Sequence, residues 1–206
     1  MFYGDAVHAG MEVAFLRESV DSLERLLSEA AKRIPDDHPP LNDAVAALAG
    51  DREALYGEFL PGVVHETHAI SCIVLLERIC RDFVKELAYA LPSKLTLNDL
   101  SGSVIERFRT YCEKVANLQF NLSDEDWQTV QGLLAIRNAL IHTGGRVESS
   151  RERRLIENFV RSHGTPEITD GQLRLSRTTS ELYLDSLSNF VNAIFHAALD
   201  RFPAEA

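Results

Sequence analysis

The sequence has few cysteines and no long run of uncharged apolar residues. Its three cysteines, Cys72, Cys80 and Cys112, are odd in number and lack C-x-x-C spacing, which disfavours a disulfide framework. No uncharged apolar stretch approaches the roughly 18 residues that a membrane span needs, and residues 1–15 lack the pattern of a signal peptide. We therefore expect a cytoplasmic protein with no membrane partner, whose thiols lie in the core.

Basic residues are also scarce, with 21 Lys and Arg against 31 Asp and Glu and a formal net charge of -10. This balance argues against a general nucleic-acid coat protein, because phosphate binding is driven by Lys and Arg. The segment from Arg137 to Arg177 is the exception, since it holds eight arginines, no lysine and five acidic residues. It is either an arginine-rich binding segment on an acidic body or an ordinary solvated surface.

The apolar spacing predicts a mostly helical chain. Residues 11–33 repeat apolar positions at helical intervals, namely Phe15, Leu16, Leu23, Leu26 and Leu27, and residues 35–40 have a loop composition. One or two short helices are expected within 41–60. Residues 63–90 predict a long helix with a core face of Ile70, Ile73, Val74, Leu76, Ile79, Phe83 and Leu87.

Further helices are expected at 103–118, 123–142, 149–163 and 179–201, and a short β-hairpin around Asp170-Gly171. The fold class is therefore all-α, a helical bundle with a small late hairpin. We expect residues 1–62 to form a helical extension packed on the bundle of residues 63–206.

The helix at 123–142 carries the pattern with the most chemistry. Ser123 and Asp126 have the spacing of a capping box, and Gly144-Gly145 is a typical helix end. On a helical wheel, Trp127, Val130, Leu133, Leu134, Leu140 and Ile141 cover one apolar face, and Arg137 falls inside it. A buried arginine needs an anion, because an unpaired buried charge costs about 3–5 kcal/mol. The anion is either a carboxylate such as Glu77 or the phosphate of a ligand.

Two neighbours favour the phosphate. Asn138 and His142 are four residues apart, so they lie on the same side of the helix. The histidine stands in the last turn, where the helix dipole favours an imidazolium, and Gly144-Gly145 keeps side-chain bulk away from it. A titrating imidazole near an amide and a guanidinium suits acid–base chemistry on a phosphate ester, although His142 alone is equally typical of a helix cap.

The stretch "IRNALIHTGG" resembles the R-(polar)-x-x-x-H motif of the HEPN superfamily, helical domains many of which are metal-independent ribonucleases of toxin–antitoxin and defence systems. The resemblance covers about residues 63–201. It implies that Arg137 and His142 are the catalytic pair, that Asn138 orients the pair or the substrate, and that no metal or cofactor is used. It also implies a homodimer that meets along the helix 123–142, with an antitoxin or defence-system partner.

The implied reaction is attack of a ribose 2′-hydroxyl on the adjacent phosphorus, giving 2′,3′-cyclic phosphate and 5′-hydroxyl ends. Arg146 and Arg151 would contact the RNA backbone. HEPN proteins that nucleotidyltransferases modify have a tyrosine two residues after the histidine, where this chain has Gly144, so control through that tyrosine is disfavoured.

Two alternatives stay open. A HEPN-like module without catalysis could bind RNA, a nucleotide or a protein and use Arg137 for structure. "HETH" at 65–68 spaces two histidines for a metal, but it is not H-E-x-x-H and has no evident third ligand.

Overall fold

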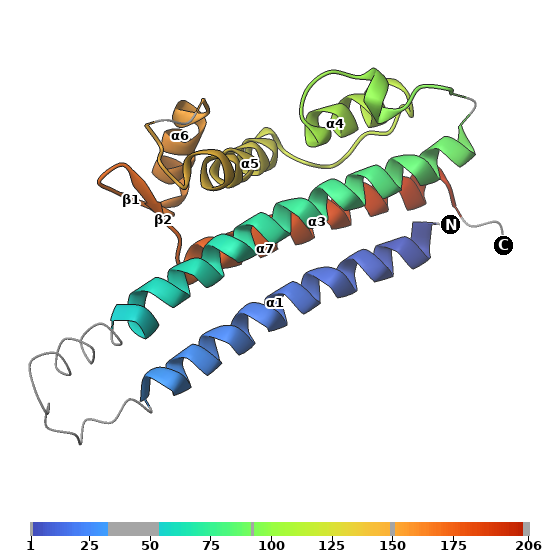
Figure 1. Ribbon diagram of the computed structural model, residues 1–206. Helices are drawn as coiled ribbons and strands as arrows, with labels where there is room; N and C mark the ends of the chain where they lie inside the picture. The colour runs from blue at the N-terminus through green and yellow to red at the C-terminus, as the bar shows by residue number, and fades with distance from the viewer. Residues whose placement is uncertain (1, 33–53, 92, 149–150, 204–206) are drawn as a thin grey trace, which may run out of the picture.

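Three long helices pack together as one group in the computed structural model, which describes residues 2–32, 54–91, 93–148 and 151–203. They are α1 (Phe2–Lys32), α3 (Leu60–Ala90) and α7 (Arg177–Arg201). Each packs on the other two, and α1 runs antiparallel to both (Figure 1). A short π-helix, η1 (Leu55–Phe59), leads directly into α3.

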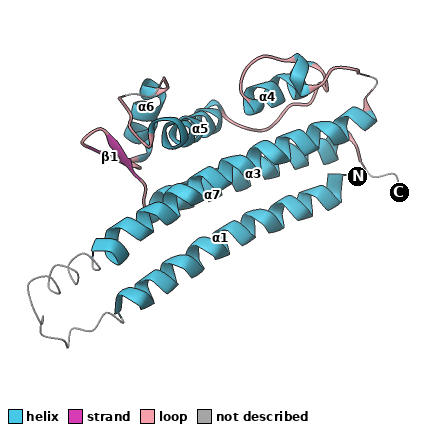
Figure 2. Cartoon of the chain, in the orientation of Figure 1, coloured by secondary structure: helices cyan, strands magenta, loops and turns pink. Residues whose placement is uncertain are grey.

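The second group of elements lies on the opposite side of α3 from α1 (Figure 2). It contains α4 (Val104–Lys114), α5 (Asp124–Thr143) and α6 (Arg153–His163), with the 3-10 turn η2 (Leu97–Asp99) before α4. The strands β1 (Glu167–Thr169) and β2 (Gln172–Arg174) pair antiparallel. Their turn places Asp170 and Gly171 at positive φ, as a tight hairpin turn requires. The predicted all-α bundle with a small late hairpin is confirmed.

The core lies where the two groups meet on α3. Phe83 is central to it, with ring centroids 5.3 Å from Phe2, 5.7 Å from Phe108 and 5.4 Å from Phe195. The three free cysteines are buried, and burial raises the pKa of Cys72 to about 12. These thiols are therefore core groups, as the sequence predicted.

The expectation for the N-terminal helix was wrong in two respects. The helix α1 begins at Phe2 rather than at residue 11, and Phe15, Leu23 and Leu26 are exposed. Its buried residues are instead Phe2, Ala9, Val13 and Val20. Most of these are small, so α1 can approach α3 and α7 closely, whereas the larger apolar residues that drew the sequence prediction lie elsewhere on the helix.

The helix α3 follows its prediction with three differences. It begins at Leu60, with Pro61 in its first turn. Of the predicted core face, Val74 is exposed and Ile70 is only half-buried. The continuous helix Leu55–Ala90 is long and apolar enough to cross a membrane by length and composition alone, but α1, α4, α5 and α7 pack against it. The expected short helices at 41–60 fall largely on residues outside the described part.

Candidate functional site

The motif helix α5 has the ends that its sequence predicts. The Ser123 hydroxyl accepts from the backbone of Asp126, and the Asp126 carboxylate accepts from the backbone of Ser123, so the capping box is confirmed. At the other end, Gly144 adopts the left-handed conformation with φ of 60°. The Arg137–His142 segment thus lies in the last turns of a well-capped helix.

The apolar face of α5 is largely occupied within the chain. Trp127, Val130 and Leu133 are buried, Leu134 and Leu140 are half-buried, and only Ile141 of this face is exposed. The helices α3, α6 and α7 pack against α5. The face is therefore not a free interface along its length, and its exposed residue, Ile141, lies at the C-terminal end of α5.

Arg137 has a carboxylate partner from another helix. Its Nη2 donates to Glu77 Oε1 of α3 at 2.8 Å, and the two side chains are only 15% and 16% exposed. Arg81 also donates to Glu77, through Oε2 at 3.3 Å. The alternative in which Glu77 supplies the anion is thus realised. The Nε atom of Arg137 is buried without a hydrogen-bond partner among the described residues.

Asn138 extends this pair into a line of hydrogen bonds from α3 to the start of α6. Arg137 Nη1 donates to Asn138 Oδ1 at 3.0 Å, and Asn138 Nδ2 donates to Glu152 Oε1 at 2.9 Å. Donors and acceptors alternate along Glu77, Arg137, Asn138 and Glu152, so each fixes the orientation of the next. No feature of the sequence indicated Glu152. This residue stands between Arg151 and Arg153 in an arginine-rich segment, and no helical spacing links it to Asn138.

His142 is exposed in the last turn of α5, one turn beyond Asn138 on the same side. No hydrogen bond or ion pair joins it to another residue in the part of the chain that the structure describes. Arg137 and His142 are separated by about 140° around the helix axis and about 7.5 Å along it. The two side chains therefore leave the helix in different directions. Arg146 and Arg151 are both exposed beyond the helix end.

Gly144-Gly145 ends the helix as expected and also contacts the hairpin. A Cβ on Gly144 would meet nothing within 4 Å, but one on Gly145 would lie 2.6 Å from Nε2 of Gln172. Backbone bonds of 2.9 Å join Leu173 N to Gly145 O and Val147 N to Gly171 O. Gly145 has a φ of 83°, which favours glycine, and its backbone joins the end of the motif helix to the hairpin.

The "HETH" segment lies in the core rather than at a metal site. His65 and His68 are both buried on α3. Desolvation lowers the pKa of His68 to about 4, with smaller contributions from His65 and Arg17, and its Nε2 lies 3.5 Å from Sγ of Cys72. Among the described residues, no three His, Cys, Asp or Glu side chains are grouped to hold a metal ion.

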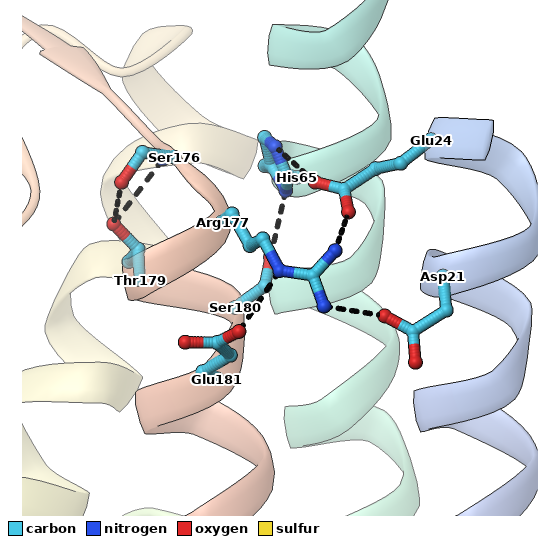
Figure 3. Close-up of polar contacts among 8 residues, drawn as sticks. All are labelled: Asp21, Glu24, His65, Ser176, Arg177, Thr179, Ser180 and Glu181. Carbon is cyan, nitrogen blue, oxygen red and sulfur yellow. Dashed lines mark hydrogen bonds and ion pairs between the residues drawn. The ribbon is translucent and has the colours of Figure 1, made fainter. Parts of the chain in front are cut away.

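A second polar cluster joins the three long helices (Figure 3). Nδ1 of His65 lies 2.9 Å from Oγ of Ser180, and its Nε2 lies 3.3 Å from Oε1 of Glu24. A carboxylate only accepts, so in the neutral ring Nε2 carries the proton and Nδ1 accepts from Ser180. Arg177 donates to Glu24, to Asp21 at 2.7 Å and to Glu181 at 2.9 Å.

This connectivity of serine, histidine and carboxylate is also that of a hydrolase triad. Ser180 is only 1% exposed, however, so a substrate could not reach its hydroxyl. The cluster instead fastens α1 to α3 and α7.

Comparison with protein-family models, with curated proteins and with solved structures found no match for this chain.

Proposed function

We propose that this protein is a metal-independent endoribonuclease of the HEPN type, with Arg137, Asn138 and His142 as its catalytic residues. The observation that carries the proposal is the exposed His142 at the end of α5, one turn beyond an Asn138 that holds Arg137 in place. A structural histidine is normally buried or bonded, as His65 and His68 are in this fold. An accessible imidazole is suited to proton transfer on a phosphate ester, and the guanidinium that Asn138 holds is suited to stabilising the charge on its oxygens.

The reaction needs few groups. The ribose 2′-oxygen attacks the adjacent phosphorus as it loses its proton, and the 5′-oxygen of the next nucleotide leaves with a proton. His142 takes or gives one of these protons, and Arg137 stabilises the charge on the phosphoryl oxygens. The products are a 2′,3′-cyclic phosphate and a 5′-hydroxyl. DNA lacks the nucleophile and is not cleaved.

A homodimer about the C-terminal ends of two α5 helices would complete this site. Within one subunit Arg137 and His142 diverge around the helix, so a phosphate could be held by Arg137 of one copy and His142 of the other. The exposed Ile141 lies at this end. Arg146 and Arg151 are exposed, and we propose that they contact the RNA backbone. In this proposal the protein acts in the cytoplasm as a toxin or defence effector, with an antitoxin or defence-system partner.

The Glu77–Arg137 ion pair favours a second candidate function. A carboxylate already satisfies one side of the guanidinium and offsets the charge that a phosphate would meet. In that case Arg137 fixes the packing of α5 on α3, and the chain is a HEPN-like module that binds RNA, nucleotide or protein without cleaving it.

One experiment distinguishes the ribonuclease from the binding module. Purified protein is incubated with end-labelled total RNA in EDTA, alongside Arg137→Lys and His142→Ala, and the product ends are analysed. We expect cleavage to cyclic-phosphate ends by the wild type and a loss of about 100-fold or more in both variants, the usual size of a proton-transfer or charge-stabilising contribution. Arg137→Lys keeps the charge beside Glu77, so the fold is disturbed less than by alanine.

The matched control for His142→Ala is His196→Ala, which removes an exposed histidine from α7 far along the chain from the motif. It should cleave at the wild-type rate. Intact RNA with the wild type would leave the binding module as the function, whereas equal cleavage by the wild type and His142→Ala would show that His142 is not a catalytic residue.

A further inference from the structure

A cavity of about 190 Å³ lies beside the catalytic motif, between α4, α5 and the start of α6. Asn138 and Glu152, the last two members of the hydrogen-bonded line, both contribute to its wall. Asn138 thus contacts Arg137 through its carbonyl oxygen and borders the cavity as well. His142 follows one turn later on the same side of α5. A group bound in the cavity would therefore lie next to the proposed reacting phosphate.

The size of the cavity matches one aromatic ring system rather than a whole nucleotide. Drug-sized ligands occupy pockets of about 300–1,000 Å³, well above the 190 Å³ found here. The apolar part of the wall is formed by Val130, Leu134 and Leu155. Trp127 forms another side, where the Cζ atom of Arg109 lies 4.5 Å from the centroid of its indole ring. Apolar walls with a polar rim suit a flat heterocycle whose polar atoms lie at its edge.

The wall of the cavity holds more carboxylates than cations. Glu106 and Glu152 are carboxylates, and Gln131 and Asn138 are amides. Arg109 is the cation of the wall, and its Nε donates to Glu113 at 2.7 Å. Glu106 accepts one bond from the backbone of Ser103, and a carboxylate has about four acceptor sites, so Glu106 retains capacity to accept.

We infer that this cavity binds a nucleobase that carries an exocyclic amino group, in the RNA next to the cleaved bond. Adenine, cytosine and guanine each present an amino group that can donate to a carboxylate. Uracil has no amino group and presents a single N–H between two carbonyl oxygens, which the acidic rim repels. The inference rests on the proposed ribonuclease for its RNA substrate, whereas base binding itself can be measured without cleavage.

Binding in the cavity can be followed by the intrinsic fluorescence of the protein. Trp127 is the only tryptophan and lies in the cavity wall, so its fluorescence responds to occupancy. We would titrate the wild type with the 3′-monophosphates of adenosine, cytidine, guanosine and uridine. A saturable change is expected with the first three, at an affinity about tenfold or more above that of uridine 3′-monophosphate, because an unmatched polar edge is costly to bury.

Leu155→Phe is the blocking variant. Leu155 lines the cavity yet is 43% exposed, so a larger side chain there can fill the mouth without overpacking the core. It should weaken binding about tenfold or more. The control is Leu95→Phe, which enlarges an equally exposed leucine away from the cavity and should bind as the wild type does.

Each outcome decides a separate point. No change with any nucleotide, or a change that Leu155→Phe leaves intact, overturns the base pocket whatever the RNA assay shows. Selective binding without any RNA cleavage sustains the pocket and removes the ribonuclease. If bases bind selectively but cleavage of uridine-only and mixed-sequence RNA is equally fast, the cavity is a site for free nucleotides, and its role in choosing the cleaved bond is wrong.

Discussion

At the scale of single residues, the main feature of this fold is the ion pair between Arg137 of α5 and Glu77 of α3. Both side chains are largely removed from water, and each ion would be costly to leave alone there. The sequence indicated that Arg137 required an anion and placed Glu77 among the choices. It could not decide between carboxylate and phosphate, because the choice depends on the rotation of α3 relative to α5.

Arg137→Ala should lower the free energy of unfolding by about 3 kcal/mol, because Glu77 would be left partly buried beside only Arg81. The double replacement Glu77→Met with Arg137→Met should recover most of this loss, since two apolar side chains of similar volume can replace a buried pair. Urea unfolding of the single and double variants measures both effects.

Arg81→Ala is the control for this pair. Arg81 donates to the same carboxylate from a more exposed position, so its removal should cost less than about 1 kcal/mol. Equal losses for Arg81→Ala and Arg137→Ala would show that the Arg137 pair contributes nothing special to stability.

At the scale of elements, the contact between α5 and α6 depends on a glycine. Gly132 is buried within α5, and a Cβ there would overlap the ring of Phe159 on α6. The ring of Phe159 also packs on His163, 4.4 Å between centroids, and Nε2 of His163 lies 3.3 Å from the hydroxyl of Thr129 on α5. The close approach at Gly132 therefore positions the helix whose first turns carry Glu152 and Leu155, two walls of the proposed base pocket.

Gly132→Ala should destabilise the protein by about 1 kcal/mol or more. Overpacking a core costs about 1–3 kcal/mol, which outweighs the gain of about 1 kcal/mol from replacing glycine within a helix. Thermal unfolding checks this, and Phe159→Leu in the same chain should restore part of the stability. Gly10→Ala on α1, where a Cβ meets nothing within 4 Å, should instead be neutral or stabilising. A Gly132→Ala variant as stable as Gly10→Ala would contradict the packing argument.

The elements themselves were largely predictable, because their signals are local. The Ser123 capping box, the Gly144 helix end and the Asp170-Gly171 turn each depend on a few adjacent residues. The start of α1 and its buried face were not predictable, because Ala9 and Val13 are core residues only by virtue of the close approach of α3 and α7. Glu152 was missed for the same reason, since its contact with Asn138 arises only when α6 folds back on α5.

At the scale of the whole molecule, two buried histidines among the three long helices make the stability of the fold depend on pH. Burial lowers the pKa of His65, which Glu24 partly offsets and Arg177 reinforces. Burial likewise lowers the pKa of His68 to about 4. Both rings are therefore neutral in the folded protein at neutral pH. Protonation of either ring would place a cation in the core between α1, α3 and α7. For His65 this cation would lie near Arg177, and for His68 it would lie near Arg17.

Because the pKa values of both histidines are lowered in the folded protein, its stability decreases as the pH falls. In the unfolded chain a histidine binds its proton near pH 6.5, while in the folded chain both rings resist protonation. The unfolded state therefore takes up more protons as the pH falls below 6.5, and the free energy of unfolding decreases. His68 alone should account for about 2 kcal/mol by pH 5, with His65 adding to it in the same direction. The loss attributable to His68 ends once the pH passes its folded pKa of about 4.

Urea unfolding between pH 7.5 and pH 5 measures this loss, and stopping at pH 5 keeps most carboxylates ionised. His68→Gln removes the stronger titration, so its stability should depend less steeply on pH than that of the wild type, even if the variant is less stable at pH 7.5. His8→Gln, which changes an exposed histidine on α1, should retain the full slope. If His68→Gln and His8→Gln gave the same slope as the wild type, the pH dependence would have to come from groups other than His68, and the contribution assigned to His68 would be wrong. A reduced slope only in His68→Gln would show that protonation weakens the contact of α1 with α3 and α7 at the histidines that the sequence had offered as metal ligands.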